Sequence, residues 1–283
     1  MKRISTMMKP ALVALALVAP ASLAHAGTVP VTGWIVHNGT STVGGTAAAP
    51  TFTAGDNITV MAPFSDVTLA NDGDFVEATT TLTMNTRTGT GINTLNTQLR
   101  LGIFDDSVNG TVTAGDIPNI GFIIQYSNLA AGGPIAEQQS LTQTSPFTSP
   151  VTIGAGVQDS GGDSIQGANP GPVTFTMRLT RNAGKIDLTG SISGTDSVST
   201  NPYLSTFAVS GYSSTNFPAN GSFTFNRIGL FMGDNVNAAS ASLANSSVTT
   251  NDVVPEPTSL MLVIGIAAGG VLLPKRRQHA SRC

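Results

Sequence analysis

A two-residue alternation of apolar and polar side chains over residues 173–180, and again over 186–193, limits what this chain can fold into more than any other feature. Apolar residues occupy every second position from Val173 to Leu179, and the pattern resumes at Ile186 after the segment 181–184, which ends in Gly. A period of two marks a strand with one buried and one solvated face, and Gly accommodates the positive φ of a tight turn. This stretch therefore predicts an antiparallel β-hairpin that packs one face against a core.

Strand-like sequence patterns extend over the central part of the chain. A second alternating stretch, 76–84, places mainly apolar residues on one face and Glu and Thr on the other. Thr and Val are β-branched, which favours strands and disfavours helices, and residues 27–252 carry no helical stripe. Segments rich in Gly and Pro, Gly39–Pro50 and Asp159–Pro172, punctuate the strands. We therefore expect an all-β domain over residues 27–252, built as a single antiparallel β-sandwich.

A six-residue pattern occurs twice, more than a hundred residues apart. Leu99–Phe104 reads Leu-Arg-Leu-Gly-Ile-Phe, and Asn226–Phe231 reads Asn-Arg-Ile-Gly-Leu-Phe. A Gly at the centre of a strand allows a neighbour to approach closely, and this separation is not the period of a solenoid. We expect two strands that lie in similar environments of one sandwich, side by side. Equivalent core strands without further meaning are the alternative.

The body of the chain is more acidic than the whole. The full sequence has 13 basic and 16 acidic residues. Three basic residues precede residue 27 and four follow residue 274, whereas one acidic residue lies outside 27–252, so six basic and 15 acidic residues give the body a net charge of −9. Nucleic acids require a basic surface, so we exclude them as partners. The only cysteine is Cys283, so no intrachain disulfide is available to this fold.

The last thirty residues combine three features in a fixed order. A rigid Pro-Glu-Pro motif comes first, an apolar run over 258–273 second, and a basic cluster last. The motif comprises Val254, Pro255, Glu256 and Pro257, and the cluster comprises Lys275, Arg276 and Arg277. An apolar helix of this length spans about 24 Å, which is short of a hydrocarbon core of about 30 Å. We expect a short transmembrane helix that is marginal as a permanent anchor and keeps its basic end in the cytoplasm.

This order of features at the end of a chain resembles the PEP-CTERM sorting signal of bacterial surface proteins, here over residues 253–283. The resemblance implies that an exosortase-type membrane protease cuts near Pro255–Pro257 and releases or transfers the body. It also implies that the C-terminal helix holds the precursor in the membrane until then. A single-pass tail anchor that carries Pro-Glu-Pro by chance is the alternative.

The N-terminal residues predict the same topology. A basic start, an apolar run over 11–19 and the small residues Ala24 and Ala26 form a secretory signal peptide over residues 1–26, which signal peptidase would cut after Ala26. An N-terminal membrane helix is the alternative, but the run is far shorter than the roughly 20 residues of a span, and Pro20 interrupts it. Both ends therefore predict export of the body to the cell envelope, the cell surface or the extracellular matrix.

Oxygen-bearing side chains recur at alternate positions after residue 104. Asp105, Ser107, Asn109 and Asp116 occupy positions 1, 3, 5 and 12 of an EF-hand-like loop, with Gly110 at the sharp turn. Ser replaces an acid at position 3 and Asp replaces the bidentate Glu at position 12, so we expect a weak calcium site. Calcium is the one cofactor that the sequence suggests, and an acidic hairpin turn without metal is the alternative.

Candidate catalytic residues are few. His37 is the only His of the body, which also lacks Cys, so we interpret it as structural rather than as part of a triad or a zinc site. Asp72, Asp74 and Glu77 superficially resemble the Glu-x-Asp-x-x-Glu signature of laminarinase-type glycosidases. Asp72 stands where that signature has its nucleophilic Glu, and Asn-Asp-Gly around it looks like a turn. We therefore predict no catalytic residue.

The last segment of the body, residues 239–250, resembles the closing strand of concanavalin A-like and related jelly-roll domains, in which an apolar-Asn-x-x-Val strand returns beside the N-terminal one. This resemblance implies a jelly-roll and no particular activity. The main hypothesis is an exported, non-enzymatic protein of the cell surface or extracellular matrix whose loops contact extracellular polysaccharide. A secreted carbohydrate-active enzyme, a glycoside hydrolase of the jelly-roll class, is the alternative.

Overall fold

The structure is a computed structural model that describes residues 26–88, 99–105, 120–126, 133–139, 147, 150–159, 165, 169–195, 201–213, 223–233 and 236–251. Every regular secondary-structure element in these ranges is a β-strand, and the strands pair antiparallel throughout. The expected all-β antiparallel fold is therefore confirmed. The signal peptide, except for Ala26, and the apolar run 258–273 lie outside the described residues.

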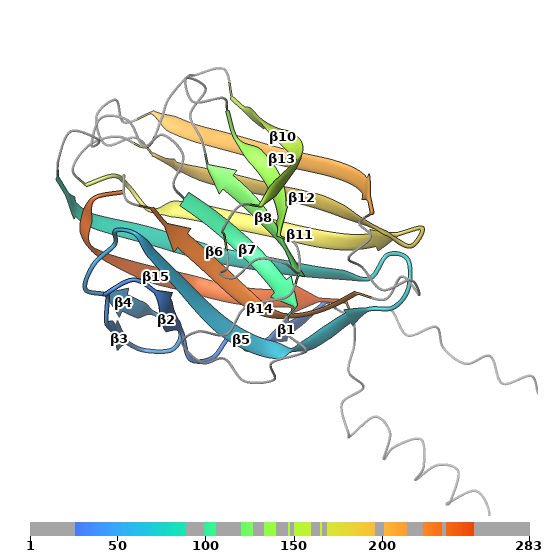
Figure 1. The fold of residues 1–283 in the computed structure, drawn as a ribbon, viewed down its shortest axis with the longest axis horizontal. Coiled ribbons are helices and arrows are strands. Elements are labelled where there is room, and N and C mark those ends of the chain that lie inside the picture. The colour runs from blue at the N-terminus through green and yellow to red at the C-terminus, as the bar shows by residue number, and fades with distance from the viewer. Residues whose placement is uncertain are drawn as a thin grey trace, which may run out of the picture.

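The described residues form fifteen strands, drawn in Figure 1. The strands are β1 (Gly27–Val29), β2 (Ile35–Asn38), β3 (Val43–Gly45), β4 (Pro50–Phe52), β5 (Ile58–Leu69), β6 (Phe75–Arg87), β7 (Leu99–Asp105), β8 (Ile120–Tyr126), β9 (Ile135–Gln139), β10 (Val151–Gln158), β11 (Val173–Asn182), β12 (Lys185–Thr195), β13 (Pro202–Tyr212), β14 (Phe223–Met232) and β15 (Ala238–Thr250).

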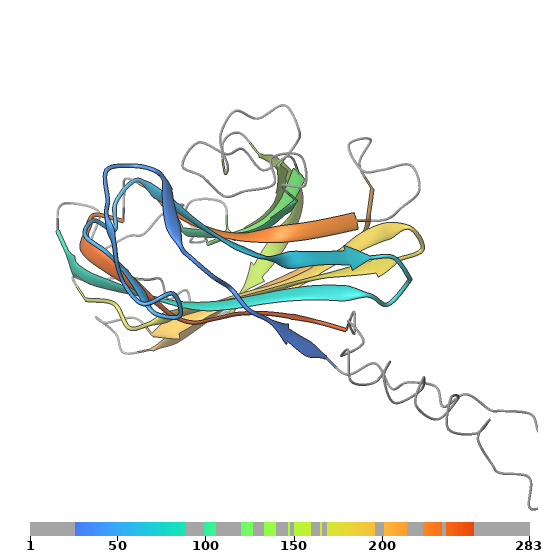
Figure 2. The ribbon, with the colours of Figure 1, turned by 90° about the horizontal axis from the view of Figure 1, so that it is seen from below.

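The strands form one continuous ribbon that folds over into two layers, which Figure 2 shows edge-on. One layer has the order β2-β5-β14-β7-β8-β9, and the other has the order β13-β12-β11-β6-β15-β4-β3, with β1 beside β15. Strand β10 joins the layers, because its first half pairs with β9 and its second half with β13. The ribbon therefore ends at two edge strands, β2 and β3, which come from nearby parts of the chain.

The hairpin predicted from the alternating stretch is β11 and β12. Its turn, Ala183–Gly184, closes the pair Asn182 and Lys185, and φ is +50° at Ala183 and +70° at Gly184. Two positive φ values are what a two-residue type I′ turn requires, and its twist matches that of the strands it joins. The sequence predicted the positive φ at Gly184, and the structure adds a second one at Ala183.

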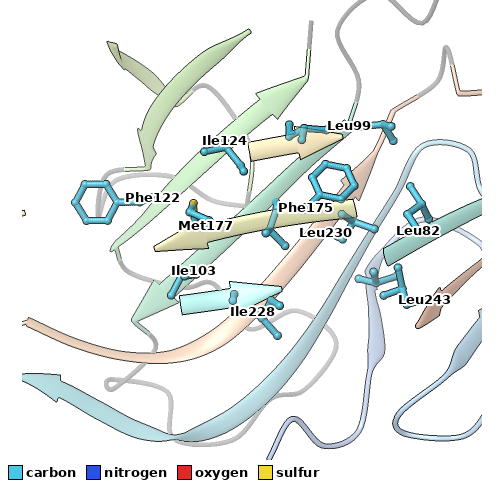
Figure 3. Packing of buried hydrophobic residues seen from close by; sticks show 14 of the residues in the cluster. Leu82, Leu99, Ile103, Phe122, Ile124, Phe175, Met177, Ile228, Leu230 and Leu243 are labelled. Carbon is cyan, nitrogen blue, oxygen red and sulfur yellow. The ribbon is translucent and has the colours of Figure 1, made fainter. Parts of the chain in front are cut away.

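The core lies between the two layers and is filled by the apolar halves of the alternating strands. From β11 and β12, all the expected inward residues are fully buried, and Figure 3 shows Phe175 and Met177 among them. Ile103, Leu230 and Ile124 reach the same core from the other layer. Each such side chain contributes roughly 1.5–3 kcal/mol by its burial, so this core stabilises the fold without any disulfide.

The two strands of the repeated pattern are neighbours. β14 runs antiparallel to β7 with Gly229 opposite Gly102. Because the pairing is antiparallel and centred on the two glycines, the Arg of each copy lies opposite the Phe of the other. The expectation of side-by-side strands is therefore confirmed.

The segment Gly39–Pro50 is more regular than its composition predicts. It contains β3, and β4 begins at its last residue. β3 has the sequence Val-Gly-Gly and is exposed along its length, and it pairs with β4 alone among the described strands. Two glycines carry no side chains to alternate, so an edge strand of this kind leaves no periodic signal in the sequence.

Candidate functional site

The two ends of the described chain meet at one edge of the molecule. β1 pairs antiparallel with the last residues of β15, with Gly27 opposite Thr250 and Val29 opposite Val248, and Figure 2 shows both at the same end of the fold. The expectation that the closing strand returns beside the N-terminal strand is confirmed. We call this edge the chain-end corner, comprising Gly27–Val29, Val248–Asn251 and the turn 71–74.

Asn251 fastens the end of β15 to the chain-end corner. Its Oδ1 accepts a hydrogen bond from the backbone N–H of Phe75 at 2.8 Å, and its Nδ2 donates to the carbonyl of Gly73 at 3.0 Å. By hydrogen-bonding to two backbone groups near the turn 71–74, this one side chain attaches the end of β15 to that turn. These two hydrogen bonds therefore fix the last described residue, Asn251, to the sandwich four residues before Pro255.

Most of the predicted processing residues lie outside the described residues. These are Ala24 at the signal cleavage site and, in the sorting motif and basic cluster, Val254, Pro255, Glu256, Pro257, Lys275, Arg276 and Arg277. Ala26 is described, is exposed and directly precedes β1. Within the described ranges, no helix is both long and apolar enough to cross a membrane.

A network of polar side chains covers the outer face of the layer that contains β7, β8 and β9. Arg100 of β7 donates through Nε to Gln125 of β8 and through Nη1 to the carbonyl of Phe147 at 2.7 Å. Its guanidinium lies 5.5 Å from the ring centroid of Phe231, and its Nε is 3.7 Å from Oε2 of Glu137. One Arg therefore ties three strands to the backbone at Phe147.

Phe147 completes a second, smaller hydrophobic cluster on this outer face. Its N–H donates to Oε1 of Gln139 at 2.6 Å, and its ring meets Phe104 edge-on at 5.2 Å and stacks on Phe231 at 5.8 Å between centroids. The central glycines of the repeated pattern leave room for these rings. The glycines in the sequence indicated that a neighbour could approach these strands closely. Nothing in the sequence around Phe147 indicated that its ring would be that neighbour.

Burial shifts the pKa values of the two charged members of this network. Glu137 is 4% exposed, and loss of water raises the pKa of its carboxyl above the ordinary value, while the charge of Arg100 opposes that rise. Burial also lowers the pKa of Arg100, and Glu137 opposes that change. A buried ion pair adds little net stability, because the desolvation of both charges offsets their attraction. We interpret the network as the fastening of Phe147 to the sheet.

The structure tests one end of the predicted calcium loop. Asp105 ends β7 and lies opposite Ile120, where β8 begins, so the loop joins two adjacent antiparallel strands. Ser107, Asn109 and Asp116 lie outside the described residues. Among the residues that the structure does describe, no three His, Cys, Asp or Glu side chains come together as a metal site would require. The calcium site stays a prediction.

The three carboxylates of the glycosidase-like segment are engaged in the turn and on the surface of the sheet. Oδ2 of Asp74 accepts a hydrogen bond from the backbone N–H of Asn71 at 2.6 Å. Oδ1 of Asp72 lies 3.6 Å from Nε of Arg181. On β6, Glu77 accepts from Nε of Arg178 at 2.8 Å. The Asn-Asp-Gly segment is a turn, as the sequence predicted, and its acids serve as turn caps and ion pairs. The body's single His, at residue 37, lies in β2.

Comparison with known proteins gives distant structural similarity alone. No protein-family model matches this chain, and no curated protein does. The winged bean acidic lectin complexed with methyl-α-D-galactose is 8% identical, with 80% of this chain and 98% of that one covered and a TM-score of 0.44. The Ulex europaeus lectin I complexed with the methyl glycoside of α-L-fucose is 10% identical, with 80% and 97% covered and a TM-score of 0.42. The metal-free carbohydrate recognition domain of Emp46p is 11% identical, with 78% and 89% covered and a TM-score of 0.41. At these values the likeness concerns the all-β arrangement and says nothing about a ligand of this chain.

Proposed function

We propose that this protein is an exported, non-enzymatic β-sandwich of the jelly-roll kind that a PEP-CTERM/exosortase system sorts to the cell surface or extracellular matrix. The observation that carries the proposal is the order of the Pro-Glu-Pro motif, the apolar run and the basic cluster in the sequence. The pairing of Gly27 with Thr250 is compatible with it, because it holds the first and last described strands together at the chain-end corner. The membrane would therefore hold the precursor by one edge, with the rest of the sandwich directed away from it.

The length of chain between the sandwich and the motif supports this arrangement. Asn251 is hydrogen-bonded to the turn below it, and a chain of four residues from Asn251 to Pro255 reaches at most about 14 Å. The cleavage site would therefore remain close to the folded body yet clear of its hydrogen-bonded strands. On the other side, cutting after Ala26 would leave β1 whole, because β1 begins at Gly27.

The composition of the body agrees with a surface or matrix role. Its net charge is −9, and only 10% of the whole chain is charged, against about 25% in ordinary soluble proteins. Hydroxyl and amide side chains fill the surface instead. Extracellular polysaccharide, which such side chains hydrogen-bond readily, is the partner that this composition favours.

Relocalisation of a sorting-motif variant in the producing bacterium tests the proposal. Replacing Pro255 and Pro257 by Ala should leave the protein in the membrane fraction with its tail attached, while the wild type reaches the envelope or matrix fraction without it. Pro30→Ala, at an exposed proline outside both terminal signals, is the control and should behave as wild type. If the double variant is cut and delivered as the wild type is, sorting by this motif is wrong.

A further inference from the structure

The strand ribbon leaves an open seam between its two edge strands, and a pocket lies in that seam. Its volume is about 200 Å³. The pocket is lined on the β2 side by Gly33 and Trp34, which precede that strand, and on the other side by β3 and the bend that follows it. The lining residues are Gly33, Trp34, Val43, Gly44, Gly45, Thr46, Ala47 and Pro50. We call this the seam pocket.

The wall formed by β3 offers backbone hydrogen-bonding groups. β3 pairs with β4 on one side and with no other described strand, so the N–H and C=O groups on its other edge point away from the sheet. Gly44 and Gly45 have no side chains to cover them, and all three residues of β3 are exposed. A ligand in the seam pocket therefore meets polar backbone beside the exposed apolar side chain of Val43.

The opposite wall contains a polar group whose hydrogen bond is missing. Trp34 is 4% exposed, and its indole Nε1–H is buried and has no hydrogen-bond partner among the residues that the structure describes. An unpaired buried donor costs about 1–3 kcal/mol, and such groups in folded proteins call for an explanation such as an absent ligand or water. A hydroxyl in the seam pocket would satisfy it once the indole ring turned its nitrogen toward the pocket, because that nitrogen is itself buried.

Charge and size restrict what the seam pocket can hold. All eight lining residues are uncharged, so nothing there compensates the desolvation of an ion, which disfavours anionic and cationic ligands. The volume equals about seven water molecules at about 30 Å³ each. It is below the range of roughly 300–1,000 Å³ that drug-sized ligands occupy. The combination fits a small, neutral ring with several hydroxyl groups.

We propose that the seam pocket binds one neutral monosaccharide unit of an extracellular glycan. The ring would lie against the exposed side chain of Val43. Its hydroxyls would bond to the β3 backbone and, after a turn of the indole ring, to the Trp34 N–H. This names a site and a ligand class for the surface protein proposed above, on which it rests for the source of the glycan. An extended peptide added to β3 is the competing occupant, but three residues with two glycines offer little edge and no side-chain pockets to read a sequence.

The chain contains its own probe for this site, because Trp34 is its only tryptophan. Full-length protein in a detergent without a sugar headgroup is titrated with glucose, galactose, mannose and N-acetylglucosamine, with glucuronate as the charged analogue and a valine-rich peptide as the competing class. We expect a saturable change of tryptophan emission with at least one neutral sugar and none with glucuronate or the peptide.

Two neighbouring alanines supply the variant and its control. Ala47 lines the seam pocket, whereas Ala48 does not, and both are exposed. Ala47→Phe should fill the pocket and weaken sugar binding at least tenfold, while Ala48→Phe binds as wild type. The proposal is overturned if no neutral sugar changes the emission, if glucuronate or the peptide changes it as much as a neutral sugar does, or if the two variants bind equally. None of these results depends on processing, so failure here leaves the sorting proposal intact, and failure of sorting leaves the pocket intact.

Discussion

Gly102 of β7 lies directly opposite Gly229 of β14, and the rings of Phe104 and Phe147 occupy the space above both. A Cβ at Gly229 would stand 3.0 Å from Phe104 and 3.2 Å from Phe147, and a Cβ at Gly102 would overlap the Phe104 ring outright. The repeated six-residue pattern is therefore a packing device. It pairs two glycines so that aromatic rings can lie on the bare backbone of the sheet.

The two glycines should respond differently to the same substitution. Gly102→Ala forces the buried Phe104 ring to move, which costs about 1–3 kcal/mol as overpacking does. Gly229→Ala needs its neighbours to shift by only a few tenths of an ångström and should cost clearly less. Urea unfolding of both variants measures the difference in free energy. Phe104→Leu should recover part of the Gly102→Ala loss, and equal costs at the two positions would refute this account of the pattern.

The parts of the fold that the sequence predicts are those whose signal is local. The β11–β12 hairpin shows a period of two, and its turn needs Gly184. The neighbouring strands β7 and β14 repeat one pattern, and Val248 lies in a closing strand that pairs with β1 as expected. In each case, adjacent residues carry both the conformation and the burial.

The parts that escape prediction depend on contacts between distant segments. Gln125 and Glu137 occupy strand positions that face away from the main core, where alternation predicts solvent, yet both are at most 5% exposed. Both contact Arg100, which is hydrogen-bonded to the carbonyl of Phe147 on that face. A single Phe in a polar stretch gives no sign of where it will pack. The sequence does not predict the strand β3, because its two glycines give no alternation of apolar and polar side chains. For the same reason it does not predict the seam pocket that β3 lines.

The raised pKa of Glu137 predicts a pH dependence of stability. A carboxyl whose pKa is higher in the folded than in the unfolded state stabilises the fold when protonated, and that contribution is lost as the pH rises through the folded-state pKa. Relative to Glu137→Gln, the wild-type free energy of unfolding should therefore rise as the pH falls, and level off below about 4.3, the unfolded value. Denaturant unfolding of both proteins between pH 4 and 8 measures it. A difference that grows with pH would contradict the direction of the shift.

The register of β1 against β15 predicts an engineered disulfide. Thr28 lies opposite Thr249, and directly opposed strand residues have Cβ atoms about 4.5–5.5 Å apart, close to what a disulfide requires. In a Cys283→Ser background, Thr28→Cys with Thr249→Cys should cross-link on oxidation and stabilise the protein by about 2–4 kcal/mol. The diagonal pair, Thr28→Cys with Ser247→Cys, is the control and should remain reduced. Cross-linking of both pairs alike would show that the chain ends are not held in this register.

The calcium loop predicts a modest thermal shift. A site with a dissociation constant of about 1 mM gains about 1.4 kcal/mol from 10 mM calcium, which corresponds to a rise in melting temperature of about 3–5 °C. Asp116→Asn removes the ligand at position 12 and should abolish the rise, whereas Asp159→Asn, outside the loop, should not. A wild-type melting temperature that calcium leaves unmoved would eliminate the site.

The masses of the terminal peptides of the mature protein, isolated from the producing cells, test the central proposal most directly. Export and sorting predict an N-terminal peptide that begins at Gly27 and a C-terminus near Pro255–Pro257, so that the sandwich from β1 to Asn251 is the working protein. A mature chain that still carries Arg276 and Arg277, or that begins at Met1, would contradict it.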